Sequence, residues 1–130
     1  MNPPTEEARE LFAAADRDRV AFRILSRDAE SPLEIVLFHA QQAIEKYLKA
    51  VLVTHRVLFR RTHDLSALHD LAVGAGLTVP LERSLLNRLV PYAVDFRYLG
   101  VGAPDVSPEE AERAIGTLRE WTEQQLKRDP

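Results

Sequence analysis

The 130-residue chain contains no cysteine, only five glycines, and no hydrophobic run near the ~20 residues that a membrane-spanning helix needs. The lack of cysteine excludes disulfide frameworks, thiolate metal sites and a cysteine nucleophile. The amino-terminal sequence MNPPTEEARE also lacks the apolar stretch of a secretory signal peptide. We therefore expect a cytoplasmic protein that has no membrane partner.

Length and composition indicate a folded domain. Hydrophobic residues make up 45% of the chain and charged residues 28%, which is too apolar for a disordered protein. A chain of 130 residues is close to the usual size of one domain. We expect a single domain over residues 1–130.

The distribution of charge is more informative than its total. The net charge is −3, with 17 basic and 20 acidic residues, which argues against a general nucleic-acid coat protein. Between positions 46 and 63, however, there are five basic residues and no acidic one, namely Lys46, Lys49, Arg56, Arg60 and Arg61. This basic segment predicts a local anion site. The alternative is a solvated loop and helix end.

Capping residues and apolar periodicity predict two long amino-terminal helices. The first runs from about Thr5 to Ala29, with acidic residues in its first turn. The second follows Ser31, Pro32 and Glu34, whose order is that of a capping box with proline at the first helical position. We expect this helix to extend to about residue 55 or 56.

Three further helices are predicted. Residues 62–64 offer caps for a short helix that ends near Val73, before two glycines. A fourth begins at Pro80 and reaches about Tyr98, with a kink or break at Pro91, because an internal proline removes a hydrogen bond. Ser107 caps a last helix that runs to about Lys127.

No segment shows the alternation of a half-buried strand. Three of the five predicted helices are long, and short loops join them, which favours antiparallel neighbours. The predicted fold is an all-α, up-and-down bundle of about five helices.

The second predicted helix carries two stripes. Its apolar positions recur at three- and four-residue steps, so the helix is expected to lie at the centre of the bundle. They are Leu33, Leu37, Ala40, Ile44, Tyr47, Leu48 and Val51. A polar stripe suits either solvent or a phosphate or protein partner, and consists of His39, Gln42, Lys46 and Lys49. Glu45 precedes Lys49 by four residues, the favourable order for a helical ion pair.

Three strings resemble the HEPN family (higher eukaryotes and prokaryotes nucleotide-binding domain), in its small prokaryotic form. They are FHAQQAIEKYLKAVL at 38–52, THDL at 62–65, and Phe96-Arg97-Tyr98. The resemblance covers roughly residues 20–126. It implies a helical bundle that commonly forms homodimers and is often encoded beside a minimal nucleotidyltransferase. Many such pairs are toxin–antitoxin systems.

In the ribonucleases of this family, which need no metal, an arginine is followed by a histidine after four to six intervening residues. Histidine exchanges protons near neutral pH, and arginine stabilises charge on the phosphate. Arg56 and His63 match this spacing at its upper limit, although Val57 replaces the usual polar residue and the pair spans a predicted connector. The resemblance therefore gives Arg56 and His63 as catalytic candidates. The structural alternative is a helix-end cation and a capping or packing histidine.

The expected nucleotide- or RNA-binding residues are His39, Gln42, Lys46, Lys49, Arg60, Arg61 and Arg97. No metal site and no cofactor is expected, because no ligand spacing or glycine-rich phosphate loop is present. Three functions remain open at this point. The chain is a nucleotide- or RNA-associated partner of a minimal nucleotidyltransferase, a ribonuclease toxin that uses Arg56 and His63 across a dimer, or a non-enzymatic dimeric adaptor.

Overall fold

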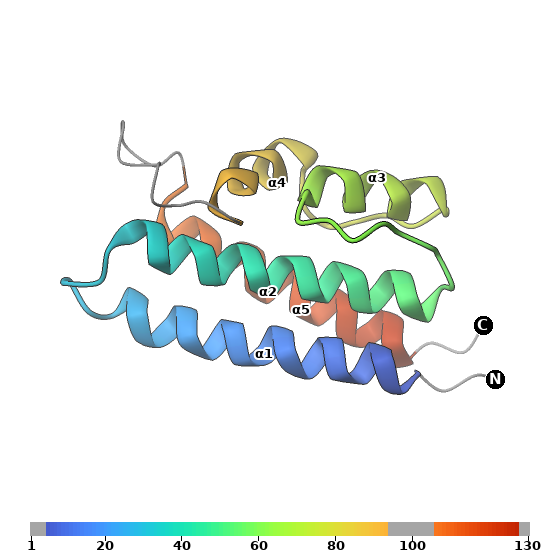
Figure 1. Cartoon of the computed structure of the whole chain (residues 1–130), viewed down its shortest axis with the longest axis horizontal. Helices are drawn as coiled ribbons and strands as arrows, with labels where there is room; N and C mark the ends of the chain where they lie inside the picture. The colour runs from blue at the N-terminus through green and yellow to red at the C-terminus, as the bar shows by residue number, and fades with distance from the viewer. Residues whose placement is uncertain (1–4, 94–105, 128–130) are drawn as a thin grey trace.

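The computed structural model describes residues 5–93 and 106–127, and these residues form five α-helices and one 3-10 turn without a strand. The all-α fold is therefore confirmed (Figure 1). The elements are α1 Glu6–Ser26, α2 Leu33–Thr54, α3 Leu65–Gly74, α4 Arg83–Leu89, the 3-10 turn η1 Val90–Tyr92, and α5 Pro108–Lys127.

The helices form an up-and-down bundle built around α2. In Figure 1, α1 and α2 run antiparallel, α5 lies behind them, and α3 and α4 lie along the opposite edge of α2. The connector of residues 55–64 leaves the end of α2 and runs back beside that helix to the start of α3. None of the helices among the described residues is long and apolar enough to cross a membrane.

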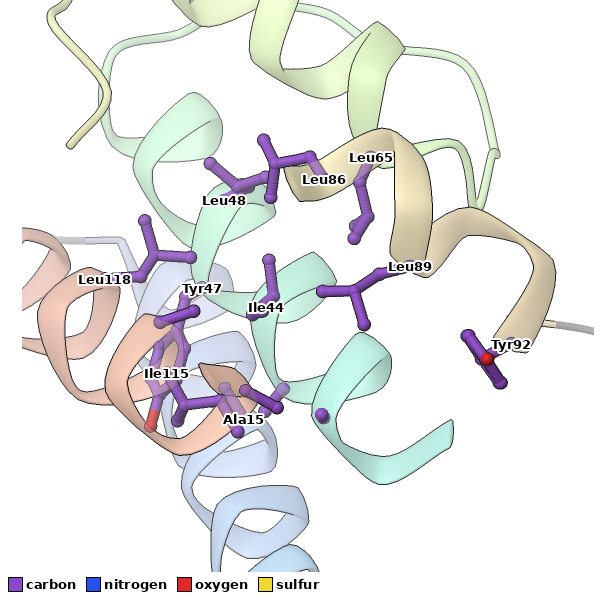
Figure 2. Close-up of a cluster of buried hydrophobic side chains, with 14 of the residues drawn as sticks. Ala15, Ile44, Tyr47, Leu48, Leu65, Leu86, Leu89, Tyr92, Ile115 and Leu118 are labelled. Atoms are coloured by element: carbon purple, nitrogen blue, oxygen red, sulfur yellow. The ribbon is translucent and has the colours of Figure 1, made fainter. Parts of the chain in front are cut away.

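The central position predicted for the second helix is confirmed. Twelve of the 22 residues of α2 are buried, and α2 contacts α1, α3, α5 and η1. Its side chains Ile44, Tyr47 and Leu48 meet leucines of α3 and α4 on one side and Ile115 and Leu118 of α5 on the other (Figure 2). A helix that is packed on several sides loses most of its solvent surface, which explains its wide apolar stripe.

Side-chain caps begin α1 and α5. The Thr5 hydroxyl accepts a hydrogen bond from the amide of Ala8 at 3.0 Å, and the Ser107 hydroxyl accepts from Glu110 at 3.1 Å. The predicted capping box at Ser31 is wrong. The Ser31 amide donates to the Asp28 carbonyl in the preceding turn, and the backbone of Pro32 is still extended, so the helix begins one residue later without a side-chain cap.

Two other predicted boundaries are wrong. The first helix ends at Ser26 instead of Ala29, because a turn follows in which the Asp28 carboxylate accepts from the Glu30 amide. The fourth helix begins at Arg83 instead of Pro80. The break expected at Pro91 is confirmed, since α4 gives way there to η1. The expected continuation to Tyr98 lies outside the described residues.

Candidate phosphate-binding surface

The four residues Thr62 to Leu65 have separate roles at the start of α3. The Thr62 hydroxyl accepts from the Asp64 amide at 3.0 Å. The Asp64 carboxylate caps α3 by accepting from the amides of Ser66 and Ala67. Leu65 is fully buried in the core. Asp64 is therefore the capping residue, and the side chain of His63 is left for another contact.

That contact is with Glu45 of α2. The carboxylate of Glu45 is 4% exposed and lies 2.9 Å from Nδ1 of His63, whose side chain is 49% exposed. Lys49 binds the other carboxylate oxygen at 2.9 Å, so the ion pair predicted between Glu45 and Lys49 is confirmed. The ammonium of Lys49 also lies 5.8 Å from the centre of the Phe59 ring. This Glu45 cluster joins the connector to the middle of α2.

A second carboxylate, Asp18 of α1, binds the other half of the polar stripe. Its two oxygens lie 3.2 Å from Nδ1 of His39 and 2.5 Å from Nζ of Lys46. Gln42 lies between the two clusters and donates to the Gln41 side chain at 2.7 Å. Both lysines of the basic segment are thus paired with carboxylates, which reduces their attraction for an external anion.

The arginines of the basic segment have a different environment. Arg56, Arg60 and Arg61 are exposed, and none of them has a carboxylate partner within residues 5–93 and 106–127. Their orientation follows from the connector, in which Val57 and Phe59 pack against the core. With Val57 and Phe59 turned to the core, Arg60, which follows Phe59, is exposed. We call Arg56, Arg60 and Arg61 the arginine group.

Arg56 has a left-handed backbone, with φ of 59°. Two hydrogen bonds define a Schellman motif at the end of α2: the Arg56 amide donates to Val53 and the Val57 amide donates to Leu52. Glycine usually occupies this position because a side chain strains it. An arginine held in this conformation at an exposed site suggests a role for its side chain beyond folding.

Arg56 and His63 are not adjacent within one chain. His63 lies beside Glu45, whereas Arg56 follows the end of α2 at Thr54, which is about 14 Å further along the helix axis. The connector runs back along α2 between these two points (Figure 1). Among the described residues, no hydrogen bond or ion pair joins the side chains of Arg56 and His63.

Sequence reasoning missed Gln41 and Asp18, and it related Glu45 only to Lys49. The contact of Asp18 with α2 spans 21 and 28 residues, and that of Glu45 with His63 spans 18, so helical spacing gives no signal for them. Arg97, the remaining predicted binding residue, lies outside the described residues. No group of three metal-ligating side chains is found among the residues that the structure describes.

Comparison with known proteins agrees with this architecture. The family model for the HEPN domain matches residues 8–127, nearly the whole chain. No curated protein and no solved structure matches the chain significantly. The match covers α1 from Ala8 onward, the other four helices in full, the Glu45 cluster and the connector that bears the arginine group. The chain therefore belongs to the HEPN family.

Proposed function

We propose that this HEPN protein binds the phosphate groups of RNA or of a nucleotide through the arginine group of the connector that leads to His63. The observation that carries the proposal is the contrast within the basic segment. Its two lysines are paired with Asp18 and Glu45, whereas its three arginines are exposed and have no carboxylate partner among the described residues. Guanidinium groups bind phosphate oxygens in bidentate geometry, and unpaired ones have no intramolecular contact to lose.

Binding to a short single-stranded RNA, measured by fluorescence anisotropy, tests this proposal. The double variant Arg60→Gln, Arg61→Gln is expected to weaken binding at least tenfold in low salt. The matched control is Arg17→Gln, Arg113→Gln, which removes the same charge from exposed arginines of α1 and α5. The proposal is contradicted if both double variants weaken binding equally, because the effect is then one of net charge alone.

The resemblance to small prokaryotic HEPN proteins extends the proposal to partners. We propose that the chain forms a homodimer and works with a minimal nucleotidyltransferase in a two-component, toxin–antitoxin-like system. The test is co-expression with the product of a neighbouring gene that carries the Gly-Ser and Asp-x-Asp motifs of such an enzyme. Co-purification in a fixed ratio is expected, and independent elution of the two proteins contradicts the partnership.

A second candidate function is RNA cleavage without a metal ion. It is favoured by one observation, the half-exposed imidazole of His63 held by the buried carboxylate of Glu45. In this reaction His63 exchanges protons and Arg56 of a second subunit stabilises charge on the phosphate. A second subunit is proposed as the source of Arg56 because Arg56 and His63 are offset along α2.

Growth of bacteria that express the chain alone tests this second candidate. A ribonuclease slows growth, and either Arg56→Ala or His63→Ala restores it. Co-expression of the two inactive variants is expected to restore part of the toxicity, because a mixed dimer contains one intact site. Harmless expression of the wild-type chain contradicts the ribonuclease but leaves phosphate binding to be judged by the anisotropy experiment.

A further inference from the structure

His63 is tied to α2 at two points, by its side chain and by its backbone. The Nδ1 atom lies 2.9 Å from Oε1 of Glu45, and the His63 carbonyl accepts a hydrogen bond from Nε2 of Gln41 at 3.1 Å. Gln41 is fully buried, and its amide nitrogen also donates to Oε1 of Glu45 at 3.0 Å. One buried amide thus holds both the backbone of His63 and the carboxylate that contacts its ring.

The other atoms of this network are also accounted for. Oε2 of Glu45 accepts from Lys49, which supplies the counter-charge of the buried carboxylate. The carbonyl oxygen of Gln41 accepts from Gln42 at 2.7 Å. The carboxylate nearest in sequence, Asp64, is used to cap α3. A carboxylate anion only accepts hydrogen bonds, so Nδ1 of His63 must be the donor in its contact with Glu45.

We propose that Glu45 and Gln41 are positioning residues that fix the neutral imidazole of His63 with its proton on Nδ1 and its bare Nε2 directed to solvent. The ring nitrogen that is free to exchange protons is set by the bond that the other one makes. Nε2 is then the acid–base atom presented to a phosphate ester that the arginine group binds. This inference deepens the proposed function, on which its catalytic meaning rests.

Burial supports the assignment. The side chain of Glu45 is 4% exposed and that of His63 is 49% exposed, so the contact lies at the edge of the protein interior. The carboxylate end of the contact is shielded from water, whereas half of the imidazole is accessible to a ligand. Among the described residues, the charged group in contact with the ring is Glu45, and its other carboxylate oxygen binds Lys49. Arg60, Arg61 and Asp64 are neighbours of His63 in the sequence.

The direct test is nuclear magnetic resonance of the full chain without RNA. Two-bond ¹H–¹⁵N correlation at alkaline pH distinguishes the protonated from the bare ring nitrogen of each neutral histidine. The expected result for His63 is a protonated Nδ1 and a bare Nε2, the opposite of the preference of free histidine. A protonated Nε2 in the wild-type protein overturns the inference, whatever the variants show.

Two substitutions separate position from charge. Glu45→Asp keeps the carboxylate but shortens its reach by one methylene, and Glu45→Gln keeps the length but removes the charge. Both are expected to populate the tautomer of His63 with its proton on Nε2, whereas the control Glu34→Gln, on the same helix, leaves it unchanged. A Glu45→Asp protein that keeps the wild-type tautomer contradicts a positional role.

Different results contradict the proposed tautomer of His63 and the proposed function. The tautomer is measured without any ligand, so its result does not depend on RNA binding. Loss of phosphate binding with an intact Nδ1–H tautomer contradicts the proposed function alone. Intact phosphate binding with a protonated Nε2 contradicts the role of Glu45 and Gln41 alone.

Discussion

Arg119 of α5 donates two hydrogen bonds to the carboxylate of Asp16 on α1, with N···O distances of 2.9 and 3.2 Å. The Tyr47 hydroxyl of α2 donates to the same carboxylate at 2.5 Å. The ring of Phe12 packs edge-on against Tyr47 and lies 5.1 Å from the guanidinium carbon of Arg119. These contacts connect the three long helices at one point.

The Asp16 contacts predict a pH-dependent contribution to stability. Burial raises the pKa of Asp16, but hydrogen bonds from Arg119 and Tyr47 outweigh it and bring the pKa below the ordinary value of 3.8. A depressed folded-state pKa stabilises the protein above pH 3.8, and the effect is lost as the pH falls through the folded-state pKa. Asp16→Asn should therefore lower the free energy of unfolding at neutral pH, by about 1 kcal/mol after allowance for the 34% exposure of the Asp16 side chain.

Guanidinium chloride denaturation of wild type and Asp16→Asn at pH 7 and about pH 2 measures this difference. The difference between the two proteins is expected to shrink at the lower pH, as the Asp16 carboxyl takes up a proton. Tyr47→Phe is the graded control, because it removes a single hydrogen bond, worth about 1 kcal/mol, and keeps the ring. A difference between wild type and Asp16→Asn that is the same at both pH values contradicts the account.

The left-handed backbone of Arg56 predicts that stability and function change in opposite directions there. Arg56→Gly should raise the free energy of unfolding by about 0.5–1 kcal/mol, since glycine adopts positive φ without strain. The same substitution removes one cation of the arginine group, so affinity for RNA should fall.

Arg56→Ala is the control for this prediction. Alanine removes the charge but keeps the strain, so its unfolding midpoint should lie below that of Arg56→Gly while both variants lose affinity. Denaturant midpoints and anisotropy titrations of the same preparations provide the comparison. An Arg56→Gly protein that is less stable than wild type shows that the arginine side chain stabilises the fold.

The buried pair of Glu45 and Lys49 predicts strong non-additivity. Lys49→Met should cost about 3 kcal/mol, because it removes the counter-charge of a carboxylate that is 4% exposed. Adding Glu45→Met removes the unpaired carboxylate, so the double variant should recover a large part of that loss. A double-mutant cycle of unfolding free energies measures the coupling, and additive effects contradict it.

The cap of α3 predicts how substitutions of Asp64 change the stability of the protein. Asp64→Ala should destabilise the protein by about 1 kcal/mol, since the amides of Ser66 and Ala67 lose their acceptor. Asp64→Ser keeps a capping oxygen and should retain most of the stability. Thermal unfolding of the two variants measures the difference. An equal loss of stability in Asp64→Ala and Asp64→Ser excludes a capping role for Asp64.

The fold was predictable because its signals are local. Apolar periodicity indicated the long helices and the central place of α2, and the i, i+4 spacing of Glu45 and Lys49 indicated their ion pair. The capping box predicted at Ser31 was wrong because a serine–proline pair occurs both at helix N-caps and in the turn before a helix. The helix start predicted at Pro80 was wrong for a similar reason, since proline also occurs in the turns between helices.

The candidate site was predictable only in part, because its decisive contacts are long-range. In the sequence the basic segment forms one group, but in the fold its lysines are paired with carboxylates and its arginines are not. Asp18 of α1 approaches Lys46, and the returning connector brings His63 to Glu45. Packing between helices decides which cations have no carboxylate partner. The spacing of residues along one helix gives no information about that packing.

The salt dependence of RNA binding tests the central claim, that the arginine group contacts phosphates, most directly. The logarithm of the binding constant falls with the logarithm of salt concentration by about 0.7 for each phosphate contact to a single strand. Arg60→Gln, Arg61→Gln is therefore expected to reduce the magnitude of this slope by about 1.4, whereas Arg17→Gln, Arg113→Gln leaves it unchanged. An unchanged slope in the connector variant contradicts the claim.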